Sequence, residues 1–436
     1  MIKNKGQKLW KKAKKIILGG NMLLSKNPDQ FLPKEWPSYY KKAKGCEIWD
    51  LENNKYKDIC LMGVGTNILG YSFKEVDKKV QTAMKSGNMS TLNCPEEVEL
   101  AEKLIEMHPW FDMVKFARTG GEANALAIRI ARAASGKDKV AFCGYHGWHD
   151  WYLAANLKNK DNLQKHLLPG LNALGVPKNL GSSVYPFNFN DYEALENIIK
   201  NHDIGAIKME VSRSKEPDKE FLKKVRKLAD RENIILIFDE CTSGFRESFG
   251  GLHKKYKVNP DMAIFGKALG NGYAITSVIG KREVMESAAS SFISSTFWTE
   301  RIGPTAALKT LEVMEREKSW EYISNLGKNI KKNWNLISEN YDLDINIEGL
   351  SALPGFTFNS KNNLAYKTLI TQEMLKKGFL ASNVVYVSTS HNEKILDSYF
   401  SALDEVFSLI KKCEMGEDIN KYLKVPICNS GFGRLN

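Results

Sequence analysis

The central part of the chain alternates short apolar runs with longer amphipathic stretches. Runs without polar alternation predict strands buried on both faces, and the stretches between them predict helices. We expect strands at 114–117, 140–143, 204–210, 234–239, 262–265 and 275–279, and helices at 96–108, 122–134 and 218–230. Strands that alternate with helices in this way predict an α/β fold with a mostly parallel sheet.

The two ends of the chain carry different patterns and predict a smaller α+β unit. A hairpin is expected around a turn at 52–54, a long helical stretch at 304–341, strands at 345–347, 355–358 and 384–387, and helices at 366–377 and 394–412. At 436 residues the chain exceeds what one core usually supports. We therefore expect an N-terminal segment at 1–60 that packs with a C-terminal small domain at 316–436, and a large domain at 61–315.

The net charge of +12 comes from lysines spread along the chain, with one dense cluster at 3–15. Apolar residues of that cluster fall on one helical face with lysines opposite, namely Leu9, Trp10, Ala13, Ile16 and Ile17. Such a helix could bind nucleic acid or a membrane surface. We favour a helix that docks on the protein or its partner subunit, and we expect no nucleic acid and no membrane as partners.

The sequence shows no expected targeting signal, and this and the cysteine spacing both favour the cytoplasm. The apolar run at 16–18 is too short for a signal peptide, and no stretch approaches the length of a membrane span. The seven cysteines are scattered without Cys-x-x-Cys spacing, so we expect free thiols in a reducing compartment and no zinc site.

Two of the apolar runs lead into residues whose side chains could take part in catalysis, Asp239 and Lys267. These residues lie 28 positions apart (267 − 239). Ligands of open α/β sheets bind at the carboxyl ends of the strands, where an acid and an amine could face one ligand. A nucleotide hydrolase would also place an acid after such a run. It requires Gly-Lys followed by Ser or Thr in a phosphate loop, and none of the four Gly-Lys pairs is followed by either residue.

Pyridoxal phosphate is a cofactor that needs an amine, an acid and a phosphate cradle together. Its aldehyde forms a Schiff base with a lysine, and an aspartate keeps the pyridine nitrogen protonated. Asp239 and Lys267 suit those two roles. The stretch Thr119-Gly120-Gly121 before a helix suits the phosphate, because backbone N–H groups and the helix dipole favour anions there. Tyr145 follows another strand and could stack on the ring.

The pair His146 and His149, with Asp150 beside it, raises the alternative of a metal site. No further ligand cluster accompanies these residues in the sequence, so we expect no metal.

The motifs together resemble those of the class III aminotransferases, which are fold-type-I pyridoxal phosphate enzymes. The resemblance is to the branch that contains glutamate-1-semialdehyde 2,1-aminomutase, and it covers nearly the whole chain. It rests on Gly19-Gly20, 43–50, 118–124, 145–147, 239–246 and 265–272. The implied fold is a large domain with a mostly parallel, seven-stranded type of sheet, plus a smaller α+β domain.

This resemblance also implies roles for individual residues. Lys267 would form the Schiff base and shuttle protons, Asp239 would pair with the pyridinium, Thr119, Gly120 and Gly121 would cradle the phosphate, and Tyr145 would stack on the ring. Glu210 matches an acidic position near the cofactor. The resemblance implies a homodimer with its active site at the subunit interface, where the neighbour contributes a threonine. Thr296 and Thr299 compete for that role, and we prefer Thr296.

Departures from the family pattern limit what can be said of the substrate. Gly121 stands where relatives often carry a hydroxyl, and Cys241 replaces an apolar residue beneath the ring. Lys26 stands near the place of an arginine that grips the substrate carboxylate in the aminomutase, and no arginine occurs between Arg316 and Arg434. Lysine cannot copy the bidentate fork of arginine. We therefore expect an acceptor other than an ordinary α-keto acid, such as a phosphorylated, sugar-like or aldehyde compound.

Three functional hypotheses follow. The first is transfer of an amino group from a small-molecule donor to a carbonyl acceptor, and its alternative is an intramolecular 2,1-aminomutase. The third is a non-catalytic binding protein on an inherited fold, which the charge alone suggests. Arg118, Arg246 and Arg301 remain as possible anion contacts or as structural residues.

Overall fold

The computed structural model describes residues 4–164, 166, 170–212 and 214–431. They form two compact units: residues 74–321 make up the first, and residues from 1–73 and 322–436 make up the second. The three-part division predicted from the sequence stays a prediction. In the part of the chain that is described, no helix has both the length and the apolar character needed to cross a bilayer.

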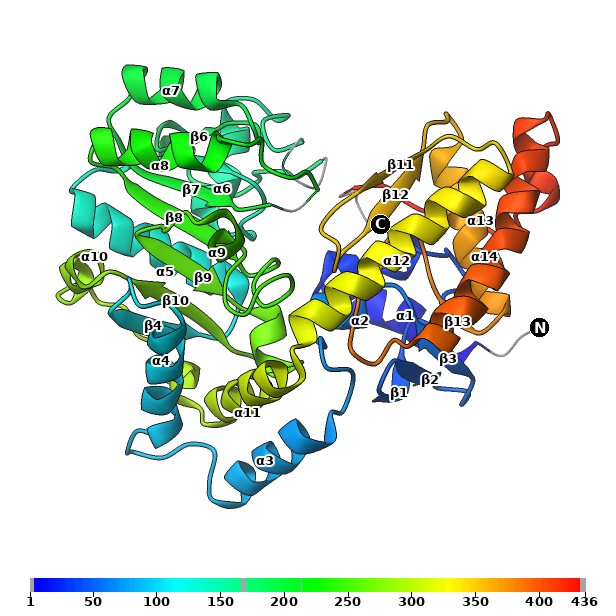
Figure 1. The fold of residues 1–436 in the computed structure, drawn as a ribbon, viewed down its shortest axis with the longest axis horizontal. Helices are drawn as coiled ribbons and strands as arrows, with labels where there is room; N and C mark the ends of the chain where they lie inside the picture. The colour runs from blue at the N-terminus through cyan, green and yellow to red at the C-terminus, as the bar shows by residue number, and fades with distance from the viewer. Residues whose placement is uncertain (1–3, 165, 167–169, 213, 432–436) are drawn as a thin grey trace. The chain divides into compact units, whose positions relative to one another are not determined.

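The unit 74–321 is built on a seven-stranded sheet (Figure 1). Its strands, in spatial order, are β4 (Met113–Ala117), β10 (Thr276–Gly280), β9 (Met262–Phe265), β8 (Ile235–Glu240), β7 (Ile204–Glu210), β5 (Lys139–Cys143) and β6 (Val184–Pro186). Only β10 runs antiparallel to its neighbours. Every residue of β7, β8 and β9 is buried, as expected for parallel strands covered on both faces.

Helices surround this sheet. They are α3 (Lys74–Lys85), α4 (Pro95–Met107), α5 (Gly120–Ser135), α6 (Asp150–Leu153), α7 (Tyr192–Asn201), α8 (Phe221–Arg231), α9 (His253–Tyr256), α10 (Arg282–Met285) and α11 (Ile302–Glu317). Helix α7 lies beside α8 (Figure 1). Helix α5 packs across the strands, and its Ala123, Leu126 and Ala127 share a core cluster with Ala206 and Ile237 of the sheet.

That packing decides which side chains meet the start of α5. Successive side chains of a strand alternate between its two faces, so Asp239 lies on the same face as Ile237. By the same rule the side chains of Lys208 and Glu210 lie on the same face of β7 as that of Ala206. The acid of β8 and two charged residues of β7 therefore lie on the face that α5 covers.

The second unit holds two small sheets. One has the order β1 (Tyr40–Lys44), β2 (Glu47–Asp50), β3 (Lys55–Asp58), β13 (Phe379–Leu380), and the other pairs β11 (Ile345–Glu348) with β12 (Gly355–Phe358). Its helices are α1 (Lys5–Ile16), α2 (Met62–Gly65), α13 (Asn363–Lys376), α14 (Glu393–Glu414) and most of α12 (Ser319–Asn340). The predicted hairpin around 52–54 is confirmed as the antiparallel pair β2 and β3.

The structure corrects several sequence-based elements. The stretch 304–341 is two helices, because Lys318 adopts a left-handed φ of 47° between α11 and α12. Residues 384–387 form no strand and make only an isolated bridge at Val384, while β13 and the edge strand β6 were not predicted.

The N-terminal helix exists, but its apolar face is narrower than the sequence predicted. Trp10 and Ala13 are buried, whereas Leu9, Ile16 and Ile17 keep 41%, 71% and 37% of their surface exposed.

Candidate active site

Asp239 and Lys267 stand at the carboxyl ends of two hydrogen-bonded parallel strands. Asp239 is the fifth residue of β8 and pairs in register with Ile264 of β9. Lys267 follows the end of β9 by two residues and begins the short 3-10 helix η5 (Lys267–Gly270). The expectation that these two residues come from neighbouring strands is confirmed.

Asp239 is held as a buried carboxylate by several donors. It is 4% exposed; its Oδ2 lies 2.8 Å from Nδ1 of the fully buried His146, and its Oδ1 accepts from the backbone N–H of Cys241 at 3.1 Å. Burial alone would raise the pKa of Asp239. The charge of Lys208 and the hydrogen bond from His146 outweigh burial and hold the pKa well below its usual value. Asp239 is thus an ionised acid that can hold a proton on a nearby base.

Lys208 is a buried cation that the sequence analysis did not single out. It is 0% exposed, and its Nζ makes no hydrogen bond within the described residues. Burial lowers the pKa of Lys208 to about 8, while Asp239 acts to raise it. The sequence did offer a signal for Lys208, because it is the one lysine within the otherwise apolar run 204–209. A buried lysine usually has a charged partner.

Lys267 is oriented by the loop that follows Asp239. Its Nζ donates to Oγ1 of Thr242 at 2.8 Å, and Thr242 is itself buried. Its backbone has a φ of 45°, a conformation that non-glycine residues adopt at a cost. A strained backbone at a lysine that follows a strand end and has this hydroxyl partner favours a functional role.

Tyr145 lies in a turn after β5 that two other residues fix. Its backbone N–H donates to Oε2 of Glu210 at 3.0 Å, and Gly144 N–H donates to Nδ1 of His166 at 3.0 Å. Gly144 has a φ of 108°, and a Cβ there would lie 2.7 Å from the Glu210 carboxylate. Glu210 therefore positions the Tyr145 turn by its contact with the backbone.

The start of α5 carries the predicted phosphate cradle. Thr119 and Glu122 form a capping box: Thr119 N–H and Oγ1–H both donate to Oε2 of Glu122, at 2.9 and 3.0 Å. Both polar groups of Thr119 are therefore engaged within the chain. The N–H groups of Gly120 and Gly121 make no hydrogen bond to any described residue, so these two amides are available to an anion at the start of α5.

Two glycines without side chains lie beside Cys241 in the site. A Cβ on Gly120 would lie 3.5 Å from Sγ of Cys241, and a Cβ on Gly266 would lie 3.3 Å from the same atom. Burial, and then the Asp239 charge, raise the pKa of Cys241 well above its usual value. Cys241 is therefore a neutral packing group, compatible with a flat ring above it.

The three arginines considered as anion contacts are all engaged in structural interactions. Arg118 pairs with Glu300 at 2.9 Å, Arg301 pairs with Glu96 at 2.7 Å, and the buried Arg246 donates to the Thr242 carbonyl at 2.6 Å. The geometry therefore favours a structural role for these three arginines over a role as anion contacts. Arg434 lies outside the described residues.

Thr296 and Thr299 are both exposed, in the short 3-10 helix η7 (Thr296–Thr299). The Thr299 hydroxyl donates to the Thr296 carbonyl at 2.8 Å. The geometry of one chain does not choose between them as the ligand of a neighbouring subunit.

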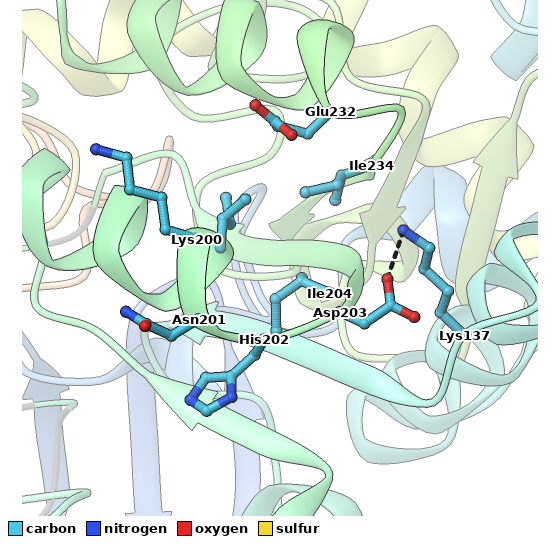
Figure 2. A pocket seen from close by; sticks show the side chains of 9 residues that line it. Lys137, Lys200, Asn201, His202, Asp203, Ile204, Glu232 and Ile234 are labelled. Carbon is cyan, nitrogen blue, oxygen red and sulfur yellow. Dashed lines mark ion pairs between the residues drawn. The ribbon is translucent and has the colours of Figure 1, made fainter.

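A separate pocket of about 350 Å³ opens at the opposite edge of the sheet (Figure 2). Lys137, Asp203 and Ile234 in its lining precede the strands β5, β7 and β8, so the pocket lies at their amino ends. Lys137 and Asp203 are paired at 2.8 Å. Because ligands of such sheets bind at the carboxyl ends, this pocket is not the active site.

The site combines an oriented lysine amine, a buried ionised acid and two backbone amides available to an anion, a donor set that suits a carbonyl cofactor with a phosphate. Pyridoxal phosphate fits this donor set and the two glycines beside Cys241. The residues 33–395 match the family model "Aminotransferase class-III".

Curated relatives agree with that match. The chain is 32% identical over 421 residues to 3-aminobutyryl-CoA aminotransferase of Cloacimonas acidaminovorans (strain Evry), covering 93% of this chain and 97% of the relative. It is 30% identical over 421 residues to glutamate-1-semialdehyde 2,1-aminomutase of Methanothrix thermoacetophila, covering 92% and 95%.

Among solved structures, the FumI protein of Sphingopyxis sp. MTA144 has a TM-score of 0.85 at 22% identity, covering 95% of this chain and 99% of that one. The chain belongs to the class III aminotransferases, with the fold-type-I architecture and pyridoxal phosphate as cofactor. It is a pyridoxal-phosphate-dependent aminotransferase of a family that also contains aminomutases.

Proposed function

We propose that Lys267 is the amine that holds pyridoxal phosphate and that Asp239 is the acid opposite the ring nitrogen. The observation that supports this most directly is their placement at the ends of adjacent strands, each fixed by its own buried partner. Gly120 and Gly121 would bind the phosphate through their N–H groups. Tyr145 would cover the ring.

Pyridoxal phosphate, when bound, supplies an aldehyde that captures amines covalently and a ring that withdraws electrons from the neighbouring carbon. Lys267 Nζ, aimed by the Thr242 hydroxyl, would accept and return the proton of the reacting carbon. Asp239, kept ionised by His146 and Lys208, would hold the proton of the ring nitrogen in place. The buried surroundings of Asp239 strengthen that interaction because water does not screen it.

We infer that the substrate carries no free carboxylate next to the reacting carbon. This rests on the lack of arginine between Arg316 and Arg434 and on the structural engagement of Arg118, Arg246 and Arg301. A thioester of the kind named for the Cloacimonas relative, 3-aminobutyryl-CoA, satisfies that condition. A phosphorylated or sugar-like carbonyl compound does so as well.

The aminomutase remains the alternative, because curated relatives at similar identity carry that name. Lys26 in place of a carboxylate-binding arginine favours intermolecular transfer. A spectral screen separates the two: an aminotransferase converts the cofactor to its aminated form with one compound and returns it with another. A mutase completes the reaction with a single compound.

We also propose a cytoplasmic homodimer in which η7 of one subunit approaches the phosphate of the other. Phe292 and Phe297, which flank Thr296, are 87% and 69% exposed in the single chain. Large exposed aromatic side chains are typical of subunit interfaces. Light scattering at micromolar concentration tests this, and a monomer that binds the cofactor fully would contradict it.

A further inference from the structure

The loop after Tyr145 brings His149 against the start of α5. Gly147, with a φ of 99°, approaches so closely that a Cβ on it would lie 3.0 Å from the Gly121 Cα. His149 comes two residues later and caps the short helix α6 without any side-chain capping bond. Its ring packs on Trp148, with centroids 4.6 Å apart.

The His149 ring occupies the space that a side chain at position 121 would need. A Cβ built on Gly121 would lie 2.8 Å from Cε1 and 2.9 Å from Nδ1 of His149, closer than carbon atoms approach such atoms. Nδ1 is buried and makes no hydrogen bond to any described residue. A purely structural histidine of this kind would normally have its ring nitrogen satisfied.

The polar groups around this point leave an anion short of side-chain donors. Thr119 is engaged with Glu122, and Gly121 has no side chain, so only two backbone amides remain at the start of α5. An imidazole N–H at the place of the missing hydroxyl supplies the third donor. Trp148 and His149 belong to the loop that also carries Tyr145, so one loop would cover the ring and contact the phosphate.

We infer that Nδ1 of His149 donates a hydrogen bond to the phosphate of the cofactor, replacing a side-chain hydroxyl at position 121. This rests on the proposed cofactor site. Gly121 is then required because any side chain there displaces His149. The pair Gly121 and His149 acts as one unit, with the glycine making room for the imidazole.

The test compares two ligands that differ only in the phosphate, pyridoxal phosphate and pyridoxal. His149→Phe keeps a ring but removes the donor, and His149→Asn places an amide N–H near the position of Nδ1. We expect His149→Phe to weaken pyridoxal phosphate binding about ten- to a hundredfold, the usual cost of a hydrogen bond to a charged group, and to leave pyridoxal binding unchanged. His149→Asn should recover part of the loss, and His202→Phe, the same exchange at a histidine that lines the separate pocket at the amino ends of the strands, is the matched control.

A second variant tests the pair. Gly121→Ser with His149→Ala restores a hydroxyl and should bind pyridoxal phosphate more tightly than His149→Ala alone. Equal losses for both ligands in His149→Phe, or no loss for either, would overturn the inference. A wild-type protein that binds neither ligand would instead contradict the proposed cofactor site, so the two failures are distinguishable.

Discussion

The two ends of the proposed cofactor site are built from different chemical groups. The ring end, which we define as Asp239, His146, Lys208, Lys267 and Thr242, lies on or just after buried strands and consists of side chains that hold one another. The phosphate end, defined as Thr119–Glu122 with His149, lies where a helix begins and consists mainly of backbone amides. By the resemblance of their motifs, the ring end follows the family pattern in its acid and amine, whereas the phosphate end departs from that pattern at Gly121.

The difference follows from what each end must do. A charge buried at the ring end needs a specific partner, because an unpaired buried charge costs about 3–5 kcal/mol. Amides at a helix start bind an anion through the backbone, so the side-chain donor that completes the site can come from another position, here His149 in place of residue 121. Changes at the ring end should therefore alter the chemistry, and changes at the phosphate end should alter the affinity for the cofactor.

The largest effect is expected for Lys267→Ala at the ring end. Loss of the covalent amine and of the proton carrier should lower kcat for any accepted amino donor by about 10⁴-fold or more, as for other covalent catalysts. The rate of cofactor conversion in single-turnover absorbance measures this. Lys223→Ala, at an exposed lysine, is the control, and full activity in Lys267→Ala would break the comparison.

Asp239→Asn should have the next largest effect. Without the carboxylate the ring nitrogen loses its proton, and kcat should fall by about 10²- to 10³-fold, as when one preorganised electrostatic group is removed. Asp239→Glu keeps the charge and should retain more activity. Equal activity in the Asn and Glu variants would show that charge is not what this residue contributes.

Acid should loosen the turn that carries Tyr145, through His166. Its Nδ1 accepts from Gly144 N–H, and burial lowers the pKa of His166 from 6.5 to about 4. At this histidine the unfolded chain therefore binds more protons than the native protein, so the contribution of His166 to stability is full above pH 6.5 and falls as pH drops towards 4. The loss is at most about 3 kcal/mol.

Urea unfolding of the cofactor-free protein from pH 7 to pH 4 measures this loss. His166→Gln, which can still accept from Gly144 N–H, should reduce the slope of stability against pH in that window. An unchanged slope would mean that His166 titrates normally in the folded protein.

Lys208→Met should have the smallest effect, because His146 still supports Asp239. We expect about a tenfold fall in kcat. This factor corresponds to a loss of electrostatic stabilisation at the ring end equivalent to roughly one pKa unit. Thermal stability should stay the same or rise, since removal of a buried cation that makes no hydrogen bond to a described residue relieves desolvation. A fall in stability without a fall in kcat would assign Lys208 a packing role.

The pH profile distinguishes the two roles of Lys208 further. Its pKa is lowered to about 8, so its charge is present below that pH and is lost above it. The wild-type protein should lose activity as pH rises through 8. The Met variant should lack that step.

Much of this arrangement could be predicted from the sequence. The apolar runs that end near Asp239 and Lys267 identify strands by composition alone, and their pairing is confirmed. The helix expected at 122–134 follows from its alanine-rich pattern, and the structure shows it as α5 with a capping box of Thr119 and Glu122.

The contacts between distant side chains could not be predicted in the same way. His146 suggested a metal pair with His149, yet it holds Asp239 at 2.8 Å, because the turn at Gly144 and Gly147 directs the two rings to different places. Thr242 lies within the motif 239–246 but was given no role, and Lys208 belongs to no motif. Which residues they meet depends on how β7, β8 and β9 lie side by side, and spacing along the chain does not specify this.

Covalent trapping tests the central claim most directly. The wild-type protein is loaded with pyridoxal phosphate, reduced with borohydride to fix the cofactor on its lysine, digested and analysed by mass spectrometry. The account predicts one modified peptide, with the cofactor on Lys267, and its absence in Lys267→Ala. Modification at another lysine, or no modification of a protein that binds the cofactor, would contradict it.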